Sequence, residues 1–129
     1  MPTLQIDGRV VVADDGESVL DAARAAGIRI PTLCHHPALE PWGGCRLCLV
    51  EAGFANRPAK LVTACTLPAE DGLVVHTRSQ AALEARRVVV DLLLARCPHT
   101  PAVLQLAREH GIEATSYAVN PEPTDCVLC

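Results

Sequence analysis

Short apolar runs alternate with turn signals through the first part of the chain. Residues 3–6 and 10–13 favour β-structure and are separated by an Asp-Gly-Arg turn, which predicts a hairpin. A second hairpin is predicted for residues 49–52 and 60–63, which flank a loop containing glycine and proline. A fifth strand is expected at residues 73–77, after another turn.

One helix is predicted between these hairpins. Ser18 is an N-cap residue, and Asp21 follows it three positions later at the capping-box position. The helix is expected to cover residues 19–26 and to end at Gly27, which can adopt the left-handed conformation.

The hydrophobic period changes after residue 78. Residues 79–96 predict a long helix with a broad apolar stripe, and Arg87 and Asp91 are placed to form an i,i+4 ion pair. Thr100 is expected to cap a further helix that runs from Pro101 to residue 110. The stripe consists of Ala82, Leu83, Val89, Val90, Leu93 and Leu94.

The pattern as a whole predicts an α+β fold in two parts. Residues 1–78 form a small unit of two hairpins, a crossover helix and a last strand. Residues 79–129 form a helical extension and a proline-containing linker to a short cysteine motif.

Composition narrows the functional classes. Hydrophobic residues make up 50% of the 129 positions, enough for a core, and the net charge of -4 removes the electrostatic basis for binding nucleic acid. The N-terminus has no basic segment followed by an apolar one, and no stretch has the length needed to span a bilayer. A cytoplasmic location is expected, and a peripheral place in a membrane complex is compatible with it.

The seven cysteines carry the clearest chemical signal. Without a secretion signal they indicate metal or redox chemistry rather than a disulfide framework. Cys34, Cys45, Cys48 and Cys65 follow the pattern Cys-x10-Cys-x2-Cys-x16-Cys and predict a four-thiolate site. A glycine pair, Gly43-Gly44, lets the backbone before Cys45 fold tightly and point N–H groups at sulfur.

Two kinds of metal centre use four thiolates. A two-iron, two-sulfur cluster takes two cysteines for each iron and moves one electron at a time. A structural zinc ion takes all four, usually as two Cys-x2-Cys pairs, whereas here one pair is split into Cys34 and Cys65. His35 and His36 could in principle be ligands of a Rieske centre, in which two histidines replace two cysteines. With four cysteines available, the two histidines are expected to form a polar loop near the site.

The motifs around these cysteines resemble a known family. Cys34-His35-His36-Pro37, Gly44-Cys45-Arg46-Leu47-Cys48 and Thr63-Ala64-Cys65-Thr66 are similar to the N-terminal ferredoxin-like domain of the large iron-sulfur subunit of respiratory NADH dehydrogenase (complex I). The same domain appears in NAD-linked and iron-only hydrogenases and in NAD-dependent formate dehydrogenases. The resemblance implies a β-grasp fold and a 2Fe-2S cluster held by Cys34, Cys45, Cys48 and Cys65.

The chain departs from that family after residue 96. The second, four-iron site of the complex I family is missing, so Cys97 is expected to be a buried or spare thiol. Cys126 and Cys129 look like the first half of a bacterial ferredoxin motif and would be a partial 4Fe-4S site. We expect the chain to be an excerpt of a longer subunit whose next segment carries 4Fe-4S clusters.

These features predict an electron-transfer subunit or domain of an NAD-linked oxidoreductase. It is expected to have no catalytic residues or substrate site of its own, because Gly43-Gly44 neither follows a strand nor opens a helix as a nucleotide-binding loop would. Flavin- or iron-sulfur-containing oxidoreductase subunits are the expected partners, in a hetero-oligomer. The alternative is a zinc-stabilised protein-interaction module without redox activity.

Overall fold

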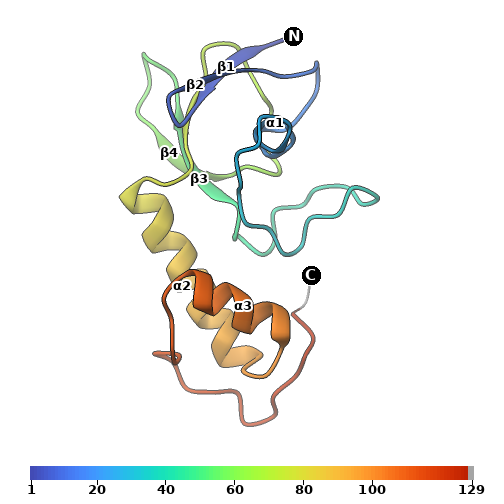
Figure 1. Ribbon diagram of the computed structural model, residues 1–129, viewed down its shortest axis with the longest axis vertical. Helices are drawn as coiled ribbons and strands as arrows, with labels where there is room; N and C mark the ends of the chain where they lie inside the picture. The colour runs from blue at the N-terminus through green and yellow to red at the C-terminus, as the bar shows by residue number, and fades with distance from the viewer. Residues whose placement is uncertain (128–129) are drawn as a thin grey trace.

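The computed structural model describes residues 1–127 and contains one five-stranded sheet and three helices. The elements are β1 (Thr3–Ile6), β2 (Arg9–Val12), α1 (Val19–Ala25), β3 (Leu49–Gly53), β4 (Lys60–Thr63), β5 (Val74–His76), α2 (Gln80–Arg96) and α3 (Pro101–Glu109). Figure 1 shows the sheet and α1 at one end of the molecule, with α2 leading away from them to α3. The predicted α+β class is confirmed.

The sheet has the order β2-β1-β5-β3-β4. β1 pairs with β2 in an antiparallel hairpin, and β1 and β5 lie parallel at the centre of the sheet. Positive φ angles of 51° at Asp7 and 79° at Gly8 form the tight turn between β1 and β2. The second strand therefore starts at Arg9, one residue earlier than predicted.

Helix α1 covers the sheet and closes the first core. Ser18 Oγ accepts the Asp21 N–H at 3.1 Å and donates to the Asp21 carboxylate at 2.7 Å, which fixes the start of the helix. The core joins buried side chains of α1 to alternate residues of the strands; among them are Val19, Leu20, Leu4, Ile6, Val50 and Val75. This unit has the β-grasp arrangement expected from the family resemblance.

Helices α2 and α3 pack on each other and form a second core. It consists of Leu47, Val90, Leu94, Cys97, Val103, Leu106, Ala107 and Ile112. Leu47 is fully buried there although it belongs to the loop before β3, so the cysteine-bearing loop is part of both halves of the molecule. Cys97 is buried, as predicted.

The predicted face of α2 is wrong in detail. Leu83 is exposed, whereas Arg86 is buried on the line formed by Ala82 and Val90. No Arg87–Asp91 ion pair is present among the described residues. Asp91 instead accepts hydrogen bonds from the Thr115 hydroxyl and the Ser116 N–H, which ties the C-terminal segment to α2.

Helix α3 begins at Pro101 and ends at Glu109, near the predicted bounds. Thr100 stands at the N-cap, but its hydroxyl does not bond to the helix backbone. It donates to the Asp125 carboxylate at 3.0 Å and so holds the C-terminal segment instead. None of the helices in residues 1–127 combines the length and apolar character that a membrane crossing requires.

Candidate metal centre

The fold brings four cysteines together from one loop and one turn. Cys48 immediately precedes β3 and Cys65 lies just after β4, and the antiparallel register that pairs Leu49 with Thr63 sets the two cysteines side by side. The Ala64 N–H donates to the Cys48 carbonyl at 3.1 Å and extends this pairing. Cys34 and Cys45 come from the irregular loop between α1 and β3.

The four thiols form two pairs. Cys45 donates its N–H to the Cys34 sulfur at 3.5 Å, and the two thiols also interact through their side chains. Cys48 and Cys65 form a second side-chain contact, within electrostatic range of the first pair. Cys34, Cys48 and Cys65 are buried, and Cys45 is half-buried.

Backbone N–H groups surround the Cys34–Cys45 pair. Burial raises the pKa of Cys45, but the N–H of Leu47, 3.4 Å from its sulfur, and further N–H groups outweigh this and leave the pKa below its ordinary value. Burial raises the pKa of Cys34, against the N–H groups of Gly44 and Cys45. The predicted N–H donors to sulfur are present, and such donors stabilise thiolates.

The Cys48–Cys65 pair has a different environment. Burial first, and then contact with Cys48, raises the pKa of Cys65 to about 12. Negative charge on Cys34 and Cys45 adds to this increase, because like charges oppose a further ionisation. The thiols together therefore resist becoming four thiolates until positive charge, such as metal, joins them.

The loop is closely packed at two glycines. Gly43 has a φ of 65°, and a Cβ there would lie 3.0 Å from the Thr63 hydroxyl oxygen. At Gly44 a Cβ would lie 2.2 Å from the Trp42 ring. Trp42 covers Gly44, but it is 60% exposed and does not seal the site.

The two histidines are not part of the cluster of four cysteine thiols. The His36 Nδ1 accepts the Ala38 N–H at 3.1 Å, and the His35 Nδ1 is buried without a hydrogen-bond partner among the described residues. Within residues 1–127 no three side chains of His, Cys, Asp or Glu gather closely enough to surround a single metal ion. The arrangement of the thiols in pairs matches a two-iron cluster, in which each iron takes two thiolates.

The sequence pattern missed one residue of the site, Arg86. Its side chain is buried and donates to the carbonyl of Leu49, next to Cys48, at 3.0 Å, and also to the carbonyl of Thr77. A charged residue on the apolar line between Ala82 and Val90 was the available signal.

The remaining cysteines lie elsewhere. The Cys97 thiol donates to the Cys126 carbonyl at 3.5 Å, within the helical extension. Cys126 is exposed. Cys129 lies outside the described residues, so the partial 4Fe-4S site of Cys126 and Cys129 stays a prediction.

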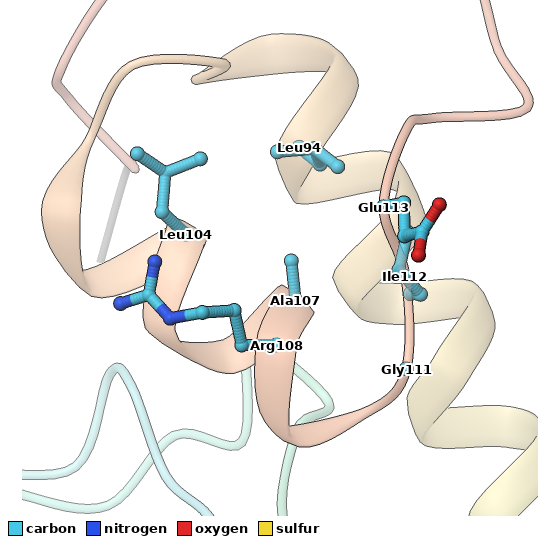
Figure 2. Close-up of a pocket in the computed structure, with 7 residues that line it drawn as sticks. All are labelled: Leu94, Leu104, Ala107, Arg108, Gly111, Ile112 and Glu113. Carbon is cyan, nitrogen blue, oxygen red and sulfur yellow. The ribbon is translucent and has the colours of Figure 1, made fainter.

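One cleft of the molecule lies away from the cysteines. It has a volume of about 510 Å³ and lies between α2 and α3. Figure 2 shows Leu94, Leu104 and Ala107 facing it, while the Glu113 carboxylate points away. None of the residues that line it is a thiol, hydroxyl or imidazole.

Comparison with known proteins identifies similar chains. The model of a family described as a 2Fe-2S iron-sulfur cluster binding domain matches residues 1–80. The NADH-ubiquinone oxidoreductase 78 kDa subunit of Candida albicans is 41% identical over 72% of this chain and 12% of its own length. The NADPH-Fe(3+) oxidoreductase subunit alpha of Geobacter sulfurreducens is 34% identical over 92% of this chain and 14% of its own length.

A solved structure extends the similarity to nearly the whole chain. It is the crystal structure of an NAD+-reducing nickel-iron hydrogenase in the H2-reduced state, with a TM-score of 0.85 and 31% sequence identity. The match covers 99% of this chain and 62% of that chain. The similarity therefore includes the helical extension as well as the sheet.

Proposed function

The chain belongs to the family of 2Fe-2S iron-sulfur cluster binding domains, and on that premise we propose that it relays single electrons within a larger nicotinamide-nucleotide-linked oxidoreductase. The family resemblance predicted from the cysteine motifs is thereby confirmed. The chain spans only 12–14% of the length of the first two relatives, whose names contain NADH or NADPH.

The proposed ligands are the two thiol pairs. Cys34 and Cys45 would hold one iron, and Cys48 and Cys65 would hold the other. The observation that carries this assignment is the pairing itself, because each iron of the cluster takes two thiolates. When bound, the cluster supplies a one-electron redox couple, and the chain supplies the ligands and N–H donors to sulfur.

The rest of the fold supports a relay rather than a reaction. Leu47 anchors the loop of Cys34 and Cys45 in the helical core, which is the core formed by α2 and α3. The hairpin of β3 and β4 holds the Cys48–Cys65 pair in place. A rigid ligand shell lowers the structural change that accompanies each electron transfer. We propose residues 1–78 as the cluster-binding unit and residues 79–129 as the connection to the next part of the electron path.

Partner subunits are proposed from the relatives. Two of them are named as subunits of oxidoreductases, which supports assembly with other oxidoreductase subunits. We propose that those subunits bind the nucleotide and a flavin or further iron-sulfur centres. The cytoplasmic location stays a prediction.

The test is the metal content of anaerobically purified protein. We expect about two irons and two acid-labile sulfides for each copy of this domain. The protein should be brown and should give an S = 1/2 EPR signal after dithionite reduction. Cys48→Ser should abolish the signal, whereas Cys97→Ala, which removes a buried thiol of the helical core, should keep it. A colourless protein that holds one zinc would overturn the proposal.

A further inference from the structure

Arg86 is a buried cation without a carboxylate partner among residues 1–127. Its side chain is 4% exposed, and the ion pairs found in this part of the chain are Met1–Asp15 and Arg29–Glu109. Buried arginines are normally paired with an anion, because an uncompensated buried charge is costly. The guanidinium is held instead by two neutral acceptors, the carbonyls of Leu49 and Thr77.

Two of the charged neighbours of Arg86 are anions when ionised. Three charged groups lie near enough to act on it: Arg78, Asp7 and Cys48. Arg78 has the same sign. Asp7 is one anion, and its carboxylate is held by the N–H and the hydroxyl of Thr77, whose carbonyl also accepts from Arg86. Cys48 is the other, and Arg86 donates to the carbonyl of the residue that follows it.

The cleft beside Arg86 contains no unpaired carboxylate among the residues that line it. It has a volume of about 150 Å³ and is lined by Arg29, Pro31, Arg78, Leu83, Arg86, Glu109 and His110. Glu109 is the one carboxylate among these residues, and it is paired with Arg29 at 2.9 Å. The cleft therefore adds no anion to Asp7 and Cys48, and of these two Cys48 is a proposed cluster ligand.

We propose that Arg86 is the fixed positive charge that balances the cluster on its Cys48–Cys65 side and raises its reduction potential. This inference rests on the proposed function. On reduction the cluster takes one electron from a donor centre and its negative charge grows by one, while Arg86 neither gains nor loses a proton. A buried positive charge stabilises the more negative, reduced state, and the two carbonyls stop the guanidinium from swinging into solvent.

The test compares three variants with the unaltered protein in EPR-monitored redox titrations. Arg86→Gln keeps an amide donor but removes the charge, and Arg86→Lys keeps the charge in a different shape. Arg87→Gln removes a charge from the exposed next position on the same helix and is the matched control. We expect Arg86→Gln to lower the equilibrium constant for reduction by about tenfold, which is about 59 mV for one electron. The other two variants should change it by less than about threefold.

Each outcome separates the two claims. If Arg86→Gln holds the cluster at an unchanged potential, or if the Gln and Lys variants shift it equally, the inference is wrong and the proposed function stands. If the Gln variant loses iron while the Lys variant loads normally, the counter-charge role is supported through assembly. Loss of iron from both variants would make Arg86 a structural clamp and overturn the inference. An unaltered protein without a 2Fe-2S cluster would overturn the proposed function itself.

Discussion

The two thiol pairs lie close together but are built in different ways. Cys34 and Cys45 sit on an irregular loop, where backbone N–H groups from glycine and its neighbours point at sulfur. Cys48 and Cys65 sit at the ends of two paired strands and are buried, and Arg86 donates to the carbonyl of Leu49, next to Cys48. Backbone N–H dipoles thus face the sulfur atoms of one pair, and in our proposal the positive charge of Arg86 balances the other pair. A site that must hold four thiolates can use both means, and each depends on a different part of the fold.

Removal of one thiol from either pair should have the largest effect. We expect Cys34→Ser and Cys65→Ser each to reduce the iron content from about two to near zero, because the two irons share their sulfides. Iron and sulfide assays of the two purified variants measure this. One iron retained in Cys65→Ser would mean that the loop pair works alone, as a single-iron site.

The second-largest effect should come from breaking the contact between the cysteine-bearing loop and the core formed by α2 and α3. Leu47→Ala removes a fully buried side chain next to the loop pair and should lower the free energy of unfolding by about 2–5 kcal/mol. Leu39→Ala, on the same loop but 65% exposed, is the control and should cost less than about 0.5 kcal/mol. Urea denaturation followed by circular dichroism gives both values. Equal costs would show that the helical core does not hold the loop.

The two glycines of the loop should differ in their tolerance of a side chain. Gly43→Ala combines a positive φ with a contact against Thr63 and should cost about 1–2 kcal/mol in the same denaturation experiment. Gly44→Ala meets only the Trp42 ring, which is free to turn into solvent, and should cost less than about 0.5 kcal/mol. A reversed order would contradict the contact between the loop and the hairpin.

The smallest expected effect is a difference in thiol reactivity of the iron-free protein. The pKa of Cys45 lies below its ordinary value, so its thiolate is present at lower pH than that of a free thiol. The pKa of Cys65 is about 12, so Cys65 stays protonated at neutral pH and becomes a thiolate only in strong alkali. Iodoacetamide labelling at a series of pH values, read by mass spectrometry with glutathione as reference, should therefore modify Cys45 first. Faster labelling of Cys65 would contradict the difference between the pairs.

Local sequence signals predicted most of the fold. Ser18 and Gly27 gave the bounds of α1 within a residue, and short apolar runs on either side of turn signals gave both hairpins. The prediction of the buried face of α2 was wrong at Leu83 and Arg86. Amphipathic patterns assume that leucine is buried and arginine exposed, whereas in the fold Leu83 is exposed and Arg86 is buried by tertiary contacts.

The site was predictable in kind but not in arrangement. Residue type and spacing singled out Cys34, Cys45, Cys48 and Cys65, and the glycine pair indicated N–H donors. The division into two pairs depends on the register of β3 and β4, which brings Cys48 next to Cys65. These residues are 17 positions apart, so local sequence patterns do not show the contact. The carbonyl contacts of Arg86 depend on the same long-range packing.

Mössbauer spectroscopy of protein enriched in ⁵⁷Fe tests the central claim most directly, because it resolves the individual iron sites. We predict two ferric sites in equal amounts in the oxidised protein, and one ferric and one ferrous site after reduction by a single electron. A single iron environment in both states, or no iron bound at Cys34, Cys45, Cys48 and Cys65, would contradict the claim that two thiol pairs hold a two-iron cluster.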